Sequence, residues 1–358
     1  MEYLTSEAYF IERFDRLARQ LGLPADLNLT QFQAWQTRLK EKLAALLGLA
    51  NFESTPMQPT YDTPEVFDGY SSQRVEISTE PGIRMPFYIL TPAGMSPGER
   101  RPVMLALAGH GGGGKEAVAG RRKIPIISER IDFYKYDYGL QLVKAGYIVL
   151  CPDARGFGER REKLSQGAAP DQLLASSCAM LNHMAQPLGQ TLAGMLTWDL
   201  MRLVDYAATR PDCDMARLGC VGLSGGGMQT LWLSIFDERV KVAVVSGYFY
   251  GYKDSLLRLN ANCSCNYVPG LWEQADMGDL GALVCPRPLL VESGSRDELN
   301  GERGLANVTE QLAISGQAYR LCGAQEKLYH SVFDGPHRYD GREVLPWLNH
   351  WLAFEQAH

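Results

Sequence analysis

The segment from Gly222 to Gly227, which reads Gly-Leu-Ser-Gly-Gly-Gly, constrains the fold of this chain more than any other. An apolar run typical of a strand precedes it at 217–221, and apolar residues at helical spacing follow it at 228–236. A serine between a strand and a helix must occupy a sharp, strained turn, which requires small residues on both sides. Such a turn raises the Ser224 hydroxyl above the sheet and leaves an N–H group free at a helix N-terminus. The strand and the helix distinguish the segment from a glycine-rich loop with an incidental serine, and they predict a nucleophile.

Strands and helices alternate along the chain after residue 100, which is typical of an α/β protein. Such alternation predicts a mostly parallel central sheet with helices on both faces. In this architecture the loops at the carboxyl ends of the strands form the site. We expect strands at 103–108, 147–151, 217–223, 240–246, 288–293 and 327–333, and helices at 138–145, 191–209 and 302–322.

The first 72 residues have a different pattern and are expected to form an N-terminal addition. Apolar residues at helical spacing predict a helix that Gly22 ends, and a second helix from about Leu29 with Thr30 as its N-cap. An antiparallel hairpin follows, with strands at 74–78 and 85–90. The predicted organisation is a helical extension over 1–50, a linker over 51–72 and a catalytic domain over 73–358, with inserts at about 115–137, 160–190 and 247–284.

A general base for the serine is expected at His337. This residue follows the last predicted strand in a Gly-Pro loop, from which a side chain can reach across the top of the sheet. His330 is the alternative, but it lies in the middle of that strand, where a histidine is usually part of the core or of a sheet edge. We therefore predict that His337 takes the proton from Ser224.

A carboxylate that orients the histidine is expected after the strand at 288–293. Asp297 lies in the turn that follows this strand, and Glu298 and Glu292 are the alternatives. An aspartate in a turn is usually a cap or a turn former. The position of Asp297 in the chain, after Ser224 and before His337, favours the catalytic assignment.

A glycine-rich loop follows the strand at 103–108 and reads Gly-His-Gly-Gly-Gly-Gly-Lys from Gly109 to Lys115. A phosphate-binding loop of the Walker type is excluded, because Lys115 is followed by Glu116 rather than by serine or threonine. Acyl transfer creates an oxyanion that needs two N–H donors, and a glycine loop beside the nucleophile can supply one of them. A loop that is merely flexible is the alternative. The candidate oxyanion and substrate-binding residues are His110, Gly111, Gly112 and Gly225.

A further pair of charged residues, Asp153 and Arg155, follows the strand at 147–151. Such pairs anchor loops through bidentate contacts more often than they take part in catalysis. We therefore predict a structural role, with Asp199 as the partner of Arg155.

The composition of the chain excludes several classes of partner and site. The formal charge of −6 argues against nucleic acid or an anionic membrane as the main partner. The first thirty residues lack a signal peptide and no stretch approaches a membrane span, so we expect a cytoplasmic protein. Eight cysteines are too few for a disulfide scaffold, and Cys263 and Cys265 are the only close pair. Two further metal ligands are not evident at the usual spacing, so neither a metal nor an organic cofactor is expected.

These segments together resemble the α/β-hydrolase superfamily, over roughly residues 75 to 350. The similar branch includes dienelactone hydrolases, acetyl-xylan-type esterases and related bacterial serine esterases. The chain departs from dienelactone hydrolases proper, which use a cysteine nucleophile where Ser224 stands here. The resemblance implies a catalytic triad in the chain order Ser224, Asp297 and His337. The motifs that carry it are His110-Gly111-Gly112, Asp153 to Gly158, Gly222 to Gly227 and Phe333 to His337.

The expected activity is hydrolysis of a carboxylic ester, of the small-acyl or carbohydrate type, through an acyl-enzyme. A peptidase or amidase, or a C–C bond hydrolase, would use the same residues, and a non-catalytic binding module is the third alternative. Aromatic residues in the inserts at 115–137 and 247–284 form either the rim of the pocket or the packing of the inserts. The sequence leaves open the acyl group, the alcohol and whether the chain forms a homo-oligomer.

Overall fold

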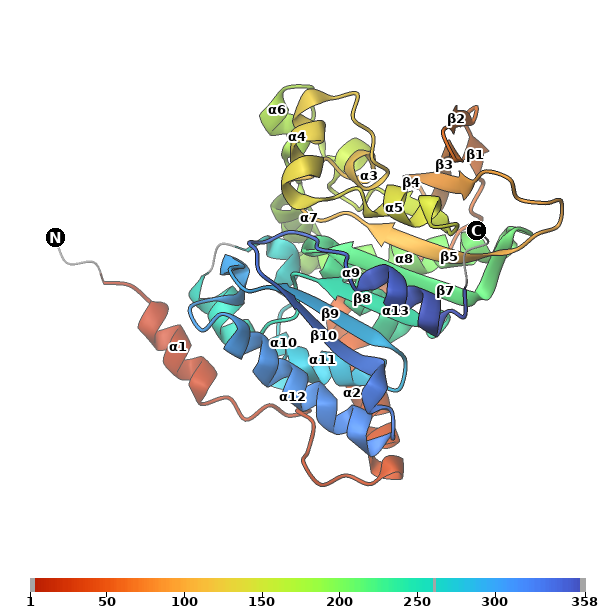
Figure 1. Ribbon diagram of the computed structural model, residues 1–358. Coiled ribbons are helices and arrows are strands. Elements are labelled where there is room, and N and C mark those ends of the chain that lie inside the picture. Colours follow the sequence, from red (N-terminus) through yellow and green to blue (C-terminus); the bar gives the residue numbers. More distant parts are fainter. Residues whose placement is uncertain (1–3, 260–261, 355–358) are drawn as a thin grey trace.

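A computed structural model describes residues 4–259 and 262–354 of the chain (Figure 1). The outermost residues of the predicted ranges 1–50 and 73–358 thus lie outside the described residues. Within these residues one ten-stranded sheet forms, in the order β1-β3-β4-β6-β5-β7-β8-β9-β10, with β2 paired to β3. Its strands are β1 Thr60–Tyr61, β2 Glu65–Phe67, β3 Tyr70–Glu80, β4 Ile83–Pro92, β5 Arg101–Leu107, β6 Ile148–Pro152, β7 Cys213–Leu223, β8 Val242–Ser246, β9 Leu289–Gly294 and β10 Leu328–Phe333.

The direction of the strands agrees with the expectation of a mostly parallel sheet. Strands β6, β5, β7, β8, β9 and β10 are parallel, whereas β3 and β4 form the expected antiparallel hairpin and β4 pairs antiparallel with β6. Strand β7 begins at Cys213, earlier than predicted, because its first residues pair with the start of β5. The carboxyl ends of the six parallel strands therefore lie along one edge of the sheet.

Helices pack on both faces of this sheet (Figure 1). No helix among the residues described is both long and apolar enough to cross a bilayer. The helices are α1 Glu7–Asp15, α2 Leu29–Leu47, α3 Lys115–Val118, α4 Pro125–Tyr134, α5 Tyr138–Lys144, α6 Pro170–Leu174, α7 Cys178–Ala185, α8 Leu192–Thr209, α9 Gly225–Phe236, α10 Leu271–Gln274, α11 Met277–Val284, α12 Leu305–Leu321 and α13 Val344–Trp351.

Strand β5 shows how the sheet joins two apolar layers. Met104 and Ala106 belong to the same core cluster as residues of α5 and α13, whereas Val103 and Leu105 belong to the cluster that includes α8. Successive side chains of a strand point to opposite faces, so a continuous apolar run is the pattern of a strand buried on both sides. This explains why the buried strands were predictable from short apolar segments.

The N-terminal helices differ from the prediction at two points. Helix α2 begins as expected, but its N-cap is Asn28 rather than Thr30: the Asn28 side chain accepts from the Gln31 N–H, and the Gln31 side chain accepts from the Asn28 N–H, both at 2.9 Å. Helix α1 ends at Asp15, well before Gly22, because the following backbone bonds to another segment. The N–H groups of Gln20 and Leu21 donate to carbonyls of residues 273 and 274 at 2.9 Å.

The predicted linker over 51–72 is partly incorporated into the sheet. Strands β1 and β2 lie within it, and both pair antiparallel with β3. Proline and aspartate lower strand propensity, which is why the composition of this segment indicated an extended linker without pairing. The extended conformation was predicted, but its backbone partners were not.

The predicted contact between Arg155 and Asp199 is confirmed. The guanidinium of Arg155 donates to both carboxylate oxygens of Asp199 at 2.8 Å, and Arg160 donates to the same carboxylate at 2.8 Å. Asp199 is buried, and a buried carboxylate is stabilised only when its charge is matched. Asp153 is also buried and accepts from the ammonium and the backbone N–H of Lys115, both at 2.8 Å. These charges join the loops after β5 and β6 to helix α8.

Replacing Asp199 by alanine is expected to lower the free energy of unfolding by about 3 kcal/mol or more, because two buried guanidinium groups lose their shared carboxylate. Urea unfolding of the full chain measures this. The exposed Asp171, replaced by alanine, is the control and should change stability by less than about 0.5 kcal/mol. Equal stability of the two variants would contradict the role assigned to this network.

Candidate active site

Ser224 occupies the sharp turn that the sequence predicts between β7 and α9. Its backbone has φ 59° and ψ −122°, outside the ordinary regions for a residue with a side chain, and its N–H donates to the Ser246 carbonyl at 2.9 Å. A Cβ atom at Gly222 would lie 2.3 Å from backbone atoms of Gly226, and one at Gly226 would lie 2.0 Å from the carbonyl oxygen of Leu107. The small residues around Ser224 are therefore required by the close approach of the backbone.

His337 and Asp297 are in direct contact at the carboxyl ends of β10 and β9. The His337 Nδ1 atom lies 2.7 Å from Asp297 Oδ2, and the other carboxylate oxygen of Asp297 accepts from the Leu299 N–H at 2.9 Å. The Asp297 side chain is 1% exposed, whereas that of His337 is 20% exposed. A buried carboxylate behind a partly exposed imidazole holds one ring nitrogen and leaves the other available. Ser224, Asp297 and His337 all line one cleft.

Of the alternative residues, Glu298 lines the same cleft, whereas Glu292 and His330 lie in other environments. Glu292 is fully buried and accepts from the Ser246 hydroxyl at 2.7 Å and from the N–H groups of Asp340 and Gly341 at 2.8 Å. Burial raises the pKa of this carboxyl despite those donors. Glu292 thus anchors the loop that carries His337. His330 lies within β10, where burial lowers its pKa, and it is not among the residues that line the cleft.

The cleft has a volume of about 910 Å³ and lies over the carboxyl edge of the sheet. Its walls come from the three predicted inserts as well as from the loops that carry the three candidate catalytic residues. Phe133, Tyr134 and Tyr267 are its aromatic side chains, whereas Tyr250 and Tyr252 are buried in the core. Some aromatic residues of the inserts therefore form the rim of the pocket, and others pack the inserts onto the body of the protein. The lining residues are His110, Phe133, Tyr134, Ser176, Cys178, Ala179, Ser224, Asn262, Cys263, Ser264, Tyr267, Arg296, Asp297, Glu298, Leu299, Pro336 and His337.

The glycine loop after β5 passes directly beside the nucleophile turn. A Cβ at Gly109 would lie 3.1 Å from the Cβ of Ser224, and one at Gly112 would lie 2.6 Å from the ring of Tyr136. The hydroxyl of Tyr136 donates to the carbonyl of His110 at 2.9 Å. The loop is packed and hydrogen-bonded in this conformation, so the alternative of a merely flexible loop is not supported. Its N–H groups and that of Gly225, the first residue of α9, remain the predicted oxyanion donors.

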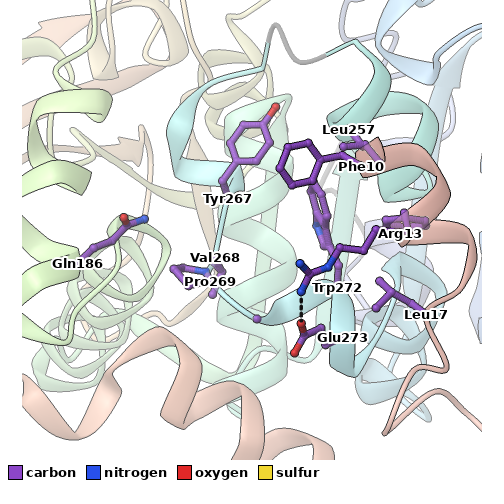
Figure 2. Close-up of a pocket in the computed structure, with 12 residues that line it drawn as sticks. Phe10, Arg13, Leu17, Gln186, Leu257, Tyr267, Val268, Pro269, Trp272 and Glu273 are labelled. Atoms are coloured by element: carbon purple, nitrogen blue, oxygen red, sulfur yellow. Dashed lines mark ion pairs between the residues drawn. The ribbon is translucent and has the colours of Figure 1, made fainter. Parts of the chain in front are cut away.

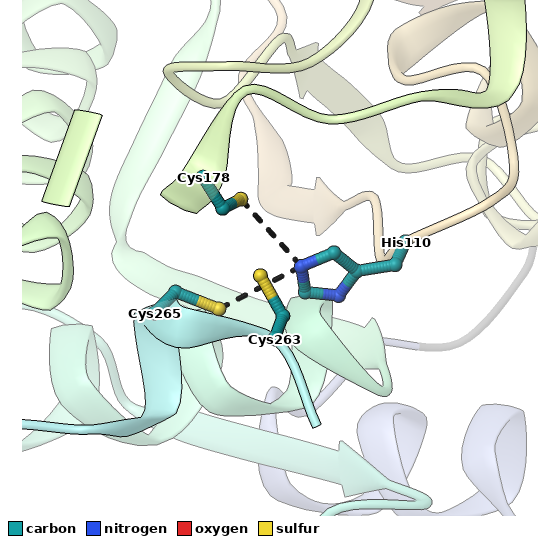
Figure 3. A group of neighbouring side chains, drawn as sticks. All are labelled: His110, Cys178, Cys263 and Cys265. Carbon is teal, nitrogen blue, oxygen red and sulfur yellow. Dashed lines mark hydrogen bonds between the residues drawn. The ribbon is translucent and has the colours of Figure 1, made fainter. Parts of the chain in front are cut away.

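The backbone of His110 belongs to the predicted oxyanion loop, whereas its side chain points toward three cysteines (Figure 3). Its Nε2 atom lies 3.7 Å from the Cys178 sulfur and 3.6 Å from the Cys265 sulfur, and Cys263 completes the group. Burial opposes the charged imidazole, but the hydrogen bonds and charges of Cys178 and Cys263 raise the pKa of His110 to about 10. Hydrogen bonds from Cys178 and Cys265 lower the pKa of the Cys263 thiol.

The structure brings two further potential ligands, His110 and Cys178, next to Cys263 and Cys265, which local spacing did not indicate. His110 is 155 residues from Cys265 in sequence and 68 residues from Cys178, so no local spacing rule could bring these side chains together. Only the strand order could have indicated this proximity. His110 follows β5, and Cys263 and Cys265 belong to the insert that follows β8, so both segments start from the carboxyl edge of the sheet.

A separate apolar pocket of about 370 Å³ lies between α1 and residues 267–273 (Figure 2). Phe10 and Leu17 line it from the N-terminal segment, opposite Tyr267 and Trp272. Arg13 forms an ion pair with Glu273 at 3.7 Å, drawn as the dashed line in Figure 2. The N-terminal segment therefore packs on the insert at 247–284.

Comparison with known sequences identifies the family. The model of the Abhydrolase family matches residues 3–242, about two thirds of the chain. The chain belongs to this family. Its sheet, with helices on both faces, is the α/β-hydrolase fold that the sequence predicts. This Abhydrolase family member is 28% identical over 186 residues to the Bacillus subtilis (strain 168) protein named "Putative hydrolase YtaP"; the match covers 51% of this chain and 58% of the length of that relative.

Solved structures of other proteins are similar in fold to this Abhydrolase family member. A protein from Bacteroides fragilis NCTC 9343, named as a putative acetyl xylan esterase, superposes with a TM-score of 0.76 at 19% identity over 93% of this chain and 83% of its own. The methylesterase BT1017 gives 0.66 at 18% identity, covering 96% and 67% of the two chains. A glucuronoyl esterase from Solibacter usitatus gives 0.64 at 16% identity, covering 93% and 96%. At these identities the likeness concerns the fold.

The contact of His337 with Gly247 offers a test of the site geometry. A Cβ at Gly247, where φ is 58°, would lie 2.9 Å from Cε1 of His337, whereas Gly82, where φ is 77°, has open space around it. Alanine at either position costs about 1–2 kcal/mol in backbone strain, but only Gly247→Ala displaces the imidazole. We expect Gly247→Ala to slow labelling of Ser224 by a fluorophosphonate about tenfold to a hundredfold.

The Gly82→Ala variant is the matched control for backbone strain and should label at the rate of the unaltered protein. Labelling rates are measured by intact-protein mass spectrometry on samples whose folding is checked by circular dichroism. An unchanged rate for Gly247→Ala in a folded sample would contradict the involvement of His337.

Proposed function

We propose that this protein hydrolyses carboxylic esters through an acyl-enzyme formed on Ser224. The observation that carries the proposal is the 2.7 Å contact between His337 and the buried Asp297. Both residues line the same cleft as Ser224, which occupies a strained turn. A binding protein gains nothing from a serine held in a strained turn in the same cleft as an oriented imidazole. Nucleophile, base and orienting carboxylate are the groups that acyl transfer requires.

The proposed reaction begins with a proton transfer from the Ser224 hydroxyl to Nε2 of His337. The serine oxygen then attacks the acyl carbon, and Asp297 stabilises the imidazolium without taking its proton. The oxyanion accepts hydrogen bonds from the Gly225 N–H and from an N–H of the loop at 110–112, and losing one such donor costs about 3 kcal/mol of transition-state stabilisation. His337 protonates the leaving alcohol and then activates the water that releases the acid.

The cleft favours a small acyl group on a larger polar alcohol such as a sugar. It is wide, and it combines the rings of Phe133, Tyr134 and Tyr267 with the cationic side chain of Arg296. Aromatic faces stack on the apolar faces of sugars, and polar groups at the rim fix their orientation. Of the structural neighbours, the one named as a putative acetyl xylan esterase agrees with this class of substrate, whereas the names methylesterase and glucuronoyl esterase describe esters with a small alcohol or with a sugar acid as the acyl group.

The nucleophile is tested with p-nitrophenyl acetate. We expect a burst of p-nitrophenol equal to the enzyme concentration, followed by slower turnover, because the activated ester acylates Ser224 faster than water removes the acyl group. Ser224→Ala should abolish the burst and lower kcat by about 10⁴-fold or more, and Asp297→Asn should lower kcat by about 10⁴-fold because it favours the wrong histidine tautomer. Equal rates for the unaltered protein and Ser224→Ala would remove the nucleophile assignment.

The substrate class is tested with a panel that includes acetylated sugars, simple acetate esters, methyl esters of uronic acids and peptide nitroanilides. We expect the highest kcat/KM for a carbohydrate ester with a small acyl group. The Ser224→Ala variant is the blank for every substrate. Higher kcat/KM on a peptide nitroanilide than on every ester would replace the ester assignment by an amidase, and activity on none of the panel would contradict the proposed class.

A further inference from the structure

The group formed by His110, Cys178, Cys263 and Cys265 is unlike an accidental cluster of buried thiols. One ligand atom from each of the four side chains lies within 4.8 Å of the ligand atoms of the others. The four residues come from three segments: the glycine loop after β5, the first residue of α7, and the insert that follows β8 (Figure 3). All eight cysteines lie in the described part of the chain and are free thiols there, so none of these three is used in a disulfide.

Two of the distances in the cluster match those between neighbouring ligands of a tetrahedral ion, and the other four do not exceed 4.8 Å. Zinc binds thiolate sulfur at about 2.3 Å and imidazole nitrogen at about 2.0–2.1 Å, so a tetrahedral site separates nitrogen from sulfur by about 3.6 Å. His110 Nε2 lies 3.7 Å from the Cys178 sulfur and 3.6 Å from the Cys265 sulfur. Ordinary packing does not require all four donors to converge in this way.

We propose that His110, Cys178, Cys263 and Cys265 bind one zinc ion. Three thiolates and one imidazole in tetrahedral arrangement are a ligand set of structural zinc sites, in which the protein fills all four positions. Soft thiolate ligands and tetrahedral geometry select zinc over magnesium, calcium and manganese, which prefer oxygen ligands in larger coordination shells. Because the coordination sphere is closed, the ion acts on the position of the three segments and takes no part in the reaction.

Burial and a hydrogen bond outside the cluster hold its four side chains close together. Cys178 and Cys265 are 1% and 2% exposed, while His110 and Cys263 are partly exposed and border the cleft. The Asn182 side chain of α7 donates to the Ser264 carbonyl at 3.1 Å, so α7 and the Cys263–Cys265 segment are joined independently of any ion. The ligands are thus brought close before a metal binds, which lowers the entropy that binding must overcome.

The proposed ion lies next to the residue that follows the nucleophile. A Cβ at Gly225 would lie 2.7 Å from Nδ1 of His110, so the imidazole packs directly against Gly225. A zinc ion on the Nε2 side of this ring fixes the glycine loop relative to Gly225 and holds two inserts at the wall of the cleft. His110 is therefore a positioning residue, and this inference does not depend on which substrate the protein cleaves.

Metal content tests the proposal on the full chain. The protein is produced without a polyhistidine tag or chelator, and its metals are measured by inductively coupled plasma mass spectrometry. We expect about one zinc per chain, and Cys263→Ser and His110→Ala should lower this value about tenfold or more. Cys322→Ser, which replaces a partly exposed cysteine outside the cluster, is the matched control and should retain the metal. A metal-free folded protein that takes up no added zinc would overturn the proposal.

The ligand set is tested by replacing zinc with cobalt(II). Thiolate ligands in a tetrahedral site give intense near-ultraviolet charge-transfer absorption and visible d–d bands, and both should weaken in the Cys178→Ser and Cys265→Ser variants. Added zinc should raise the Tm of the apo-protein and leave that of Cys263→Ser unchanged. A cobalt spectrum without thiolate bands, zinc retained in full by Cys263→Ser, or a disulfide among the three cysteines in protein isolated under non-reducing conditions would each contradict the assignment.

Discussion

The close approach of backbone at the Ser224 turn is the constraint on which the rest of the site depends. Gly226 lies so close to the carbonyl of Leu107 that no side chain fits between them, so the start of α9 is pressed against the end of β5. This contact fixes the glycine loop beside the proposed nucleophile. It also fixes His110 against Gly225, and with it the position of the cysteine cluster. One steric requirement thus organises both the candidate catalytic centre and the proposed metal site.

Two buried carboxylates at the carboxyl end of β9, Glu292 within the strand and Asp297 in the turn after it, have different roles because their hydrogen-bond partners differ. Asp297 faces the imidazole of His337 and can stabilise a positive charge there. Glu292 accepts hydrogen bonds from a hydroxyl and two backbone N–H groups, and burial raises its pKa. It therefore anchors the loop after β10 and has no place in the proposed reaction. Position at the carboxyl end of the same strand made both of them candidates, and the partner of each carboxylate distinguishes them.

The parts of the site that were predictable from sequence are those that a local pattern or the chain order determines. The strand, turn and helix around Ser224 follow from apolar runs and small residues, and Asp297 and His337 follow from their positions after successive strands. The Asn28 cap and the early end of α1 were not predictable, because each depends on which nearby or distant group a backbone N–H meets. The cysteine cluster was missed for the same reason, since its four side chains become neighbours only when three segments meet at one edge of the sheet.

The central claim is that a covalent acyl group forms on Ser224, and mass spectrometry of an acid-quenched reaction tests it most directly. The protein is mixed with an excess of p-nitrophenyl acetate, quenched within the burst, digested and mapped. The account predicts one acetyl group per active chain on the peptide that contains Ser224, and no acetyl group on that peptide in the His337→Ala variant. An acetyl group on Cys263, which borders the same cleft, or turnover without acylation of Ser224, would contradict the account.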